Sequence, residues 1–333
     1  MHSKNFTSNA LLLMRIVQFR NKDNSTHVGL VEGERLRLLN EVTSTYALTQ
    51  KVFESGKTLL ELVDMLAGDV TISYQPLLDH KQVLLPLMHP DPYRCWVTGT
   101  GLTHLGSAAS RDEMHQKLKG SDPDELTDSM KMFRMGLENG RMLNGKPGVQ
   151  PEWFYKGNGL SVVPTGHELV SPAFALDGGE EPELAGLYVI DPDGNPFRLG
   201  FAVGNEFSDH KMEKINYLYL AHSKLRMSAY GPEILISELP DHLVGLSRIL
   251  RGEKVVWQKE FLTGQANMSH NIVNLEHHHF KYDLFRQPGD VHVHYFGTSV
   301  VSFADGIEVQ HGDRFEISIP ELGKPLINTL RQV

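Results

Sequence analysis

Residues 180–224 read EEPELAGLYVIDPDGNPFRLGFAVGNEFSDHKMEKINYLYLAHSK. An apolar run leads to Ile190, the five residues DPDGN follow at 191–195, and the chain returns to a second apolar run at 201–203. An Asp-Gly pair in so short a link is a turn signal, and the β-branched and aromatic residues before it favour a strand. The stretch therefore predicts two antiparallel strands that lie side by side.

This hairpin brings three carboxylates together. Glu181 and Glu183 stand two residues apart, so their side chains point to the same face of the first strand. Glu206 stands at the far end of the second strand, which returns it to the first pair. Oxygen-only ligands suit a hard divalent cation, Mg2+ first, with Mn2+ or Ca2+ as alternatives. Because Glu-x-Glu is common on solvated strands, an exposed acidic face is the competing interpretation.

Several short motifs follow one another between Trp153 and the end of the chain. They are EPEL at 181–184, GFAVGNEFS at 200–208, Lys224 ahead of GP at 231–232, PGDV at 288–291, GT at 297–298, GD at 312–313 and LGKPLIN at 322–328. No single motif is specific, but their order is. In this order of motifs the chain, from Trp153 to its end, resembles the fumarylacetoacetate hydrolase superfamily.

The resemblance implies an α+β, mainly β fold. A rolled β-sandwich or β-barrel-like catalytic domain would follow a small N-terminal α/β cap domain, and the many Gly and Pro turns agree with rolled β architecture. The resemblance also implies that Glu181, Glu183 and Glu206 are the metal ligands. In the family the third ligand is usually Asp, so Glu206 departs from the pattern. The family's Thr-Gly-Thr-Pro is also altered, to FGTS at 296–299.

Proline placement predicts two domains. The PDP sequence at 90–92 is a boundary signal. It divides a small α/β domain at 14–88 from a catalytic domain at 89–333. Residues 1–13 precede the first expected strand, and we expect them to be a disordered or peripheral extension.

The polar, Met-rich residues 105–150 interrupt the catalytic domain. They are either a mobile lid or a fixed helical insertion that packs on the domain or on a dimer partner. If a lid closes there, Arg111 could clamp a substrate carboxylate through two hydrogen bonds. Elsewhere the pattern predicts helices at 44–55, 59–67, 240–249 and 268–275.

Composition limits the classes of function. The chain has 333 residues, of which 40% are hydrophobic and 22% charged, as in a soluble globular protein. A formal net charge of -9 argues against nucleic acid as a partner. The single cysteine, Cys95, excludes an internal disulfide framework and suits a reducing compartment. The apolar run at 10–14 is too short to span a membrane, so we expect a cytoplasmic protein.

Candidate catalytic and substrate-binding residues come mainly from the resemblance. It implies a catalytic role for Lys224 and a substrate-binding role for Gly297 and Thr298, whereas an isolated Lys is ordinarily a solvated surface residue. Lys156, at the end of an expected strand, is a weaker candidate of the same kind. His104 follows a strand and could act as acid or base. The alternative for His104 is a structural side chain at the strand end.

Position 107 bears on the type of reaction. In hydrolysing members of the family, a His near position 104 is followed by Glu three residues on, or pairs with a distant Glu, and the pair activates water. Here position 107 is Ser107, so this pair is not evident. The sequence therefore favours elimination over hydrolysis.

Two further groups of histidines are candidate sites. Residues 277–279 follow a helical stretch, where the helix dipole favours cations without any further function. His292 and His294 share one face of an expected strand. They would form either a second metal pair or a polar face near the pocket mouth, and we expect the polar face.

These observations and the resemblance together imply a metal-dependent enzyme acting on a 2-oxo acid through a metal-stabilised enolate. The expected activity is a 2-keto-3-deoxy sugar acid (pentonate) dehydratase, a hydro-lyase. Lys224 would stabilise the enolate or shuttle the proton, His104 would assist, and Thr298 would hold the substrate carboxylate. An acylpyruvate or diketo-acid C–C hydrolase is the first alternative, and a non-catalytic sugar-acid-binding protein is the second. The family is commonly dimeric, which implies a homodimer.

Overall fold

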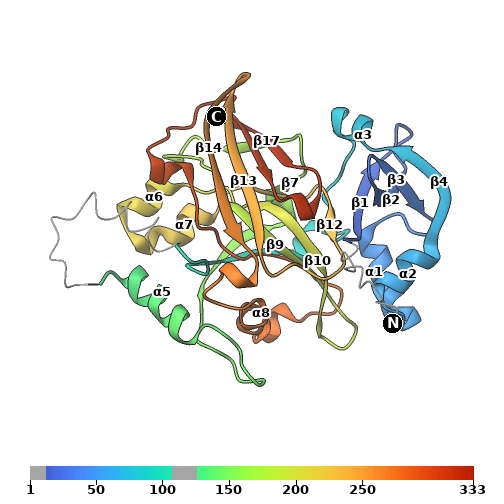
Figure 1. Ribbon diagram of the computed structural model, residues 1–333, viewed down its shortest axis with the longest axis horizontal. Coiled ribbons are helices and arrows are strands. Elements are labelled where there is room, and N and C mark those ends of the chain that lie inside the picture. The colour runs from blue at the N-terminus through green and yellow to red at the C-terminus, as the bar shows by residue number, and fades with distance from the viewer. Residues whose placement is uncertain (1–12, 107–125) are drawn as a thin grey trace, which may run out of the picture.

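The computed structural model describes residues 13–106 and 126–333. Strands dominate it and form two sheets (Figure 1). Across the larger sheet the strands are β4 (Ala67–Ser73), β3 (Arg35–Leu39), β2 (Thr26–Glu32), β1 (Arg15–Arg20), β12 (Ile234–Leu235), β10 (Pro196–Asn205), β9 (Pro182–Ile190), β15 (Val291–Tyr295), β5 (Cys95–Gly101) and β6 (Glu152–Asn158). Beside this row, β11 (Ser228–Tyr230) pairs with β10, and β7 (Val162–Val163) pairs with β11. Across the smaller sheet they are β14 (Lys254–Thr263), β13 (Leu243–Arg251), β16 (Arg314–Ser318), β17 (Leu326–Gln332) and β8 (Glu168–Ser171).

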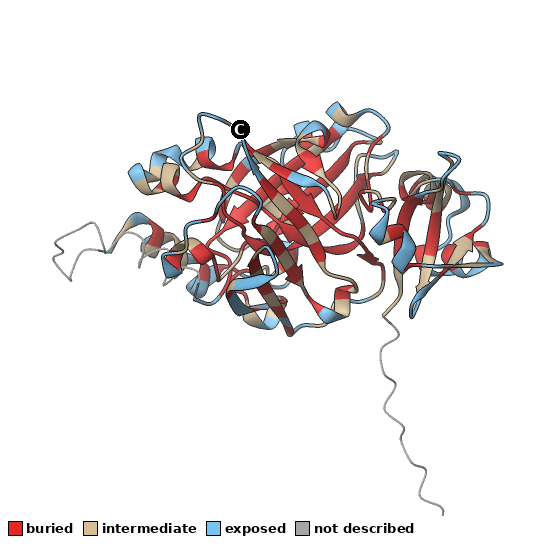
Figure 2. Cartoon of the chain, turned by 90° about the horizontal axis from the view of Figure 1, so that it is seen from above, coloured by how far each residue is buried: buried red, intermediate tan, exposed pale blue. Residues whose placement is uncertain are grey.

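The predicted α+β, mainly β fold is confirmed. The larger sheet runs from a free edge at β4 to another at β6, and the smaller one from β14 to β8, so within the described residues neither closes into a barrel. Figure 2 shows buried residues concentrated along the strands of the main body, with exposed residues at its periphery. The fold is thus of the rolled, layered kind rather than a closed barrel.

The predicted hairpin at 180–206 is confirmed as β9 and β10. The two strands pair antiparallel, with Glu183 opposite Gly204. In the turn, the amide of Gly194 donates to the carbonyl of Asp191 at 3.0 Å. Gly194 has a φ of +82°, a backbone conformation that glycine adopts without strain. The Asp-Gly signal therefore identified the turn correctly.

β9 is a central strand that is buried on both faces. Its residues Leu184 and Tyr188 contribute to a cluster shared with the smaller sheet. Leu187 and Val189, which point the other way, contribute to a second cluster together with the N-terminal helices. The first residues of β9 are therefore held rigidly between two layers, which matters because the candidate site begins there.

The N-terminal strands and helices form the blue lobe of Figure 1. Helices α1 (Thr45–Ser55) and α2 (Leu59–Leu66) match the predicted ones, and Thr58 with Glu61 forms a capping box at the start of α2. A short helix α3 (Gln75–Asp79) follows β4. β1 pairs with β12, so hydrogen bonding continues from this lobe into the main sheet. The division at 88/89 stays a prediction.

In the part of the chain that the structure describes, the remaining α-helices are α5 (Asp128–Asn139), α6 (His210–Ile215), α7 (Leu220–Lys224) and α8 (Ile272–Phe280). The prediction of a helix at 240–249 is wrong, because this segment is strand β13, paired with β14 and β16. Of the helices in the described ranges, none has the length and apolar character needed to cross a membrane.

The predicted insertion at 105–150 is described only in part, and residues 107–125, including Arg111, lie outside the described residues, as do 1–12 of the predicted extension. The segment after α5 is fixed to the main body. The amide of Met142 donates to Asn271 at 2.9 Å, and the amide of Gly148 donates to Asn274 at 2.8 Å. This part of the insertion is therefore packed on the domain.

Candidate metal centre

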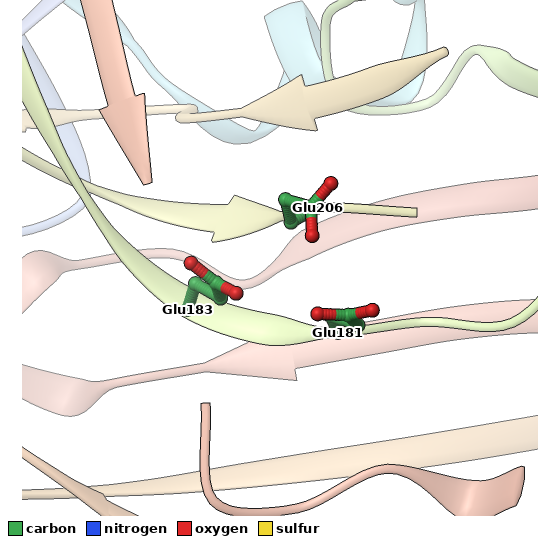
Figure 3. Close-up of side chains that lie close together, drawn as sticks. All are labelled: Glu181, Glu183 and Glu206. Atoms are coloured by element: carbon green, nitrogen blue, oxygen red, sulfur yellow. The ribbon is translucent and has the colours of Figure 1, made fainter. Parts of the chain in front are cut away.

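Three buried carboxylates meet where β9 begins and β10 ends (Figure 3). Glu181 immediately precedes β9, Glu183 is the second residue of β9, and Glu206 follows the last residue of β10. One carboxylate oxygen from each residue lies within 4.8 Å of those of the other two. The sequence-based prediction that these side chains converge is confirmed, and the exposed acidic face is excluded because all three are buried.

Two lysines hold Glu206 from opposite sides. The ammonium of Lys156 lies 2.7 Å from Oε1 of Glu206, and that of Lys224 lies 2.6 Å from Oε2. Lys224 also donates to Oε1 of Glu181 at 2.5 Å, so it bridges two of the three carboxylates. It lies against the ring of Phe154, 4.9 Å from the ring centroid. Both ammonium groups are buried.

The two lysines do not balance the charge of the carboxylates. Burial, reinforced by the carboxylates of Glu206 and Glu181, raises the pKa of Glu183 well above its usual range. Burial also raises the pKa of Glu206 to about 7, although Lys156 opposes the rise. A divalent cation relieves this kind of repulsion among oxygen ligands, so the donor set fits a hard cation such as Mg2+.

Glu181 differs from the other two carboxylates because its cationic neighbours outweigh burial. Burial by itself would raise its pKa, but the ammonium of Lys224 and the ring of His210 outweigh burial and hold the pKa well below the usual range. Nε2 of His210 lies 3.1 Å from Oε1 of Glu181, and Nδ1 lies 3.7 Å from Asp177. Glu181 is therefore the carboxylate that stays ionised most readily.

Glu183 is oriented by the backbone at Gly297, whose amide donates to Oε2 at 2.7 Å. Gly297 has a φ of +95°, and a Cβ there would lie 2.4 Å from Oγ1 of Thr103 and 2.9 Å from the carbonyl of Thr100. Only glycine fits this close approach. Gly297 thus acts on Glu183 through its backbone, next to the cavity.

A cavity opens beside the carboxylates. Its lining includes Glu181, Glu183 and Lys224, and among the other predicted residues Gly297 and Thr298. The remaining lining residues are Thr100, Gly101, Leu102, Phe154, His210, Glu213, Ser299, Val300 and Val301. The structure thus brings together five of the residues that the sequence singled out.

His104 and Lys156 do not line this cavity. His104 is buried, with Nδ1 3.0 Å from Oγ1 of Thr103 and Nε2 2.8 Å from Oγ1 of Thr263. Burial lowers the pKa of His104 to about 4. This placement matches the structural interpretation of His104. Lys156 lies behind Glu206, where it also donates to the carbonyl of Phe207 at 2.6 Å.

Sequence reasoning missed three residues near the carboxylates. His210 and Glu213 line the cavity from α6, and Ser208 donates to the carbonyl of Glu206 at 2.8 Å. Ser208 belonged to a quoted motif, and His210 follows it by two residues. Their positions just after Glu206 were the available signal, because a chain that turns into a helix directly after this carboxylate stays near the site.

His292 and His294 do not form a polar face at the pocket mouth, so that prediction is wrong. Both are fully buried, and Nδ1 of His292 lies 3.0 Å from Nε2 of His279. Nδ1 of His294 lies 2.8 Å from Oγ1 of Thr98, within hydrogen-bond distance. The rings of Trp96 and Phe285 pack against His292. The strand face is polar in sequence, but an aromatic layer covers it.

Comparison with protein-family models and with curated proteins gives no match for this chain. Solved structures do match it. One is "2-keto-3-deoxy-D-arabinonate dehydratase complexed with magnesium and 2,5-dioxopentanoate", with a TM-score of 0.69 and 21% identity, covering 96% of this chain and 99% of that one. Another is a 2-hydroxyhepta-2,4-diene-1,7-dioate isomerase from Mycobacterium marinum, with a TM-score of 0.57 and 15% identity, covering 96% and 98%. The likeness establishes the fold along nearly the whole chain.

Proposed function

Because the chain has the fold of the fumarylacetoacetate hydrolase superfamily, we propose that it is a metal-dependent hydro-lyase that removes water from a 2-keto-3-deoxy sugar acid, a pentonate. The observation that carries the proposal is the buried triad of Glu181, Glu183 and Glu206 beside a cavity that Lys224 also lines. A homodimer and a cytoplasmic location remain predictions.

The three carboxylates would hold the cation, and Mg2+ is the one that we propose. A structure with this fold is complexed with magnesium and 2,5-dioxopentanoate, a small 2-oxo acid. A divalent cation at such a site acts as a Lewis acid toward the keto oxygen of the substrate. That 2-oxo acid also has the composition that a 2-keto-3-deoxypentonate reaches by losing one water.

Lys224 would stabilise negative charge that develops on the substrate. Burial tends to lower its pKa, but Glu181 and Glu206 outweigh burial and raise it. Lys224 therefore stays protonated, and it serves as a hydrogen-bond donor rather than as the base that removes the C3 proton. Thr298 lines the cavity beside Gly297, and its hydroxyl donates to the carbonyl of Val300 at 3.1 Å. We propose that Thr298 binds the carboxylate of the substrate.

The surroundings of His104 favour elimination over hydrolysis. In the hydrolysing members of the family that this chain resembles, a His paired with a carboxylate activates water. His104 instead contacts the hydroxyls of Thr103 and Thr263, and it is not part of the cavity lining. Loss of water from C3 and C4 requires no such pair.

Product analysis tests the proposal. The purified protein would be incubated with Mg2+ and a panel of 2-keto-3-deoxypentonates and acylpyruvates, and the products followed by mass spectrometry. We expect a semialdehyde formed by loss of one water, and loss of turnover when a chelator removes the metal. Cleavage of an acylpyruvate into two carboxylates, or no turnover of any acid, would overturn the proposal.

A matched pair of lysine variants adds a control. Lys224→Met should lower kcat by about 100-fold or more, because one buried donor to developing charge is worth that much in comparable sites. Lys211→Met removes an ammonium on the neighbouring helix that pairs with Glu308 instead. It should leave kcat within about twofold.

A further inference from the structure

The two carboxylate oxygens of Glu181 have different surroundings. Oε1 accepts from the ammonium of Lys224 at 2.5 Å, and Nε2 of His210 lies 3.1 Å from the same oxygen. An ionised carboxylate only accepts hydrogen bonds, so the nitrogen of His210 that contacts it carries a proton. A carboxylate oxygen has two lone pairs, and two donors occupy both of them. Oε2 is therefore the oxygen that Glu181 can offer to a cation.

The ring of His210 is fixed on three sides. His210 is the first residue of α6, and the side chain of Asp209 caps the start of that helix. The carboxylate of Asp177 lies 3.7 Å from Nδ1 of the ring. One face of the ring stacks on Phe303, with ring centroids 5.4 Å apart. These contacts hold the donor nitrogen in place against Glu181.

The other two carboxylates of the triad are also engaged by N–H donors. The amide of Gly297 donates to Oε2 of Glu183 at 2.7 Å. In Glu206, the ammonium of Lys156 contacts Oε1 and that of Lys224 contacts Oε2. A cation that took both oxygens of either carboxylate would compete with at least one of these donors. The protein thus favours a binding mode in which each carboxylate gives the cation one oxygen.

This binding mode distinguishes Mg2+ from Ca2+. Ca2+ takes about six to eight oxygen ligands at roughly 2.3–2.6 Å, and carboxylates often bind it through both oxygens. Mg2+ is smaller, requires a nearly ideal octahedron and usually keeps several waters. Three single carboxylate oxygens completed by water or substrate oxygens suit Mg2+, whereas Ca2+ would lack ligands.

We propose that His210 is a positioning residue through which the centre selects Mg2+ over Ca2+, because it holds Glu181 in a binding mode that offers one oxygen. The inference rests on the proposed function, since it requires a divalent cation at the triad. Without the donor from His210, one lone pair of Oε1 becomes available. Glu181 can then turn to bind a larger cation through both oxygens.

Metal binding in the absence of substrate tests this inference. Mn2+ would be added to the full-length, metal-free protein, its binding followed by electron paramagnetic resonance, and Mg2+ or Ca2+ used to displace it. We expect Mg2+ to bind the wild type about tenfold more tightly than Ca2+, the effect of one hydrogen bond to a charged group. His210→Phe keeps a ring against Phe303 but removes the donor, so it should abolish most of this preference.

Two further variants show whether the donor itself is responsible. His210→Gln keeps an N–H group that can reach Oε1 of Glu181, so it should retain a preference close to that of the wild type. A role confined to packing predicts the reverse order, with the Phe variant closer to the wild type than the Gln variant. His222→Phe makes the same change at an exposed position on α7 and should leave both affinities unchanged.

The outcomes separate this inference from the proposed function. A wild type that binds Ca2+ as tightly as Mg2+ would overturn the selection while the metal site stands, and this measurement applies even if His210→Phe does not fold. An unchanged preference in His210→Phe would overturn the role of His210 in the same way. If Mn2+ does not bind the wild type at all, the metal site and the proposed function fail.

Discussion

At the scale of single residues, the site is defined by three buried carboxylates and the two buried lysines that contact them. The side chain of Glu206 is one methylene longer than that of the Asp usual in the family. Each of its two carboxylate oxygens contacts a different lysine. Lys156 contacts Glu206 from outside the cavity, whereas Lys224 lies within the lining. We infer that Lys156 stabilises the fold of the site and that Lys224 faces the substrate.

Replacing Glu183 should separate metal binding from folding. Glu183→Gln removes a carboxylate whose charge is disfavoured by burial and by two neighbouring carboxylates, so the metal-free variant should unfold at the same temperature as the wild type or higher. Mg2+ at about 100 times its Kd should stabilise the wild type by about 2.7 kcal/mol and the variant by much less. Differential scanning calorimetry with and without Mg2+ measures both. Equal stabilisation of both proteins by Mg2+ would contradict this assignment.

Replacing Lys156 should mainly affect stability. Lys156→Met leaves Glu206 with one cationic partner in place of two, in a region without solvent. Breaking a buried ion pair from one side costs about 3–5 kcal/mol. Urea unfolding should show a loss of this size, whereas Lys51→Met, which breaks an exposed pair with Glu41, should change the free energy of unfolding by less than about 1 kcal/mol. A fully stable Lys156→Met protein would refute the structural role.

At the scale of elements, the hairpin was predicted correctly and strand β13 was not. β9 and β10 carry a local turn signal, whereas the residues of β13 are apolar at spacings that also suit a helix. Leu243, Gly245, Ser247 and Ile249 are buried in alternation with more exposed residues, which is the period of a strand. This segment is a strand because it pairs with β14 and β16, which come from later in the chain.

The packing of α8 on β15 should make the fold sensitive to acid. Burial lowers the pKa of His292 and His294 to about 3, so both are neutral in the folded protein. In the unfolded chain each takes up a proton near pH 6.5. The unfolded state therefore binds more protons below that pH, and stability is full above about pH 6.5 and falls as the pH drops toward the folded pKa.

The test compares the pH dependence of unfolding in two variants. His294→Gln should reduce the slope of the free energy of unfolding against pH, between about pH 6 and 4, by up to about 1.4 kcal/mol per pH unit. His80→Gln alters an exposed ring and should leave the slope unchanged. Parallel curves for His294→Gln and the wild type would show that this ring does not titrate on unfolding.

At the scale of the whole molecule, the N-terminal lobe and the main body share a sheet and a core. β1 pairs with β12, and one cluster contains Leu48 and Leu62 of the lobe together with Leu187 of β9. Residues of the lobe thus cover one face of the strand that begins at the three carboxylates. The sequence suggested two domains, but the shared core is a tertiary feature that no local pattern reports.

This shared core predicts cooperative unfolding. Because removing the lobe would expose apolar residues on the main sheet, we expect a single thermal transition whose calorimetric and van't Hoff enthalpies agree. Differential scanning calorimetry of the full chain without metal provides the measurement. Two separate transitions would show that the lobe folds independently and that the boundary near residue 88 is also an energetic one.

By itself, the sequence determined the β9–β10 hairpin, the fold class and the convergence of Glu181, Glu183 and Glu206. The hairpin and the convergence depend on alternation along a strand and on a short turn, which are local properties. The fold class came from the order of motifs on which the family resemblance depends. Only the tertiary structure decided that His104 lies outside the cavity and that Lys156 lies behind Glu206. It also placed Glu213 in the cavity wall, because such positions follow from how helices and sheets pack across long separations in the chain.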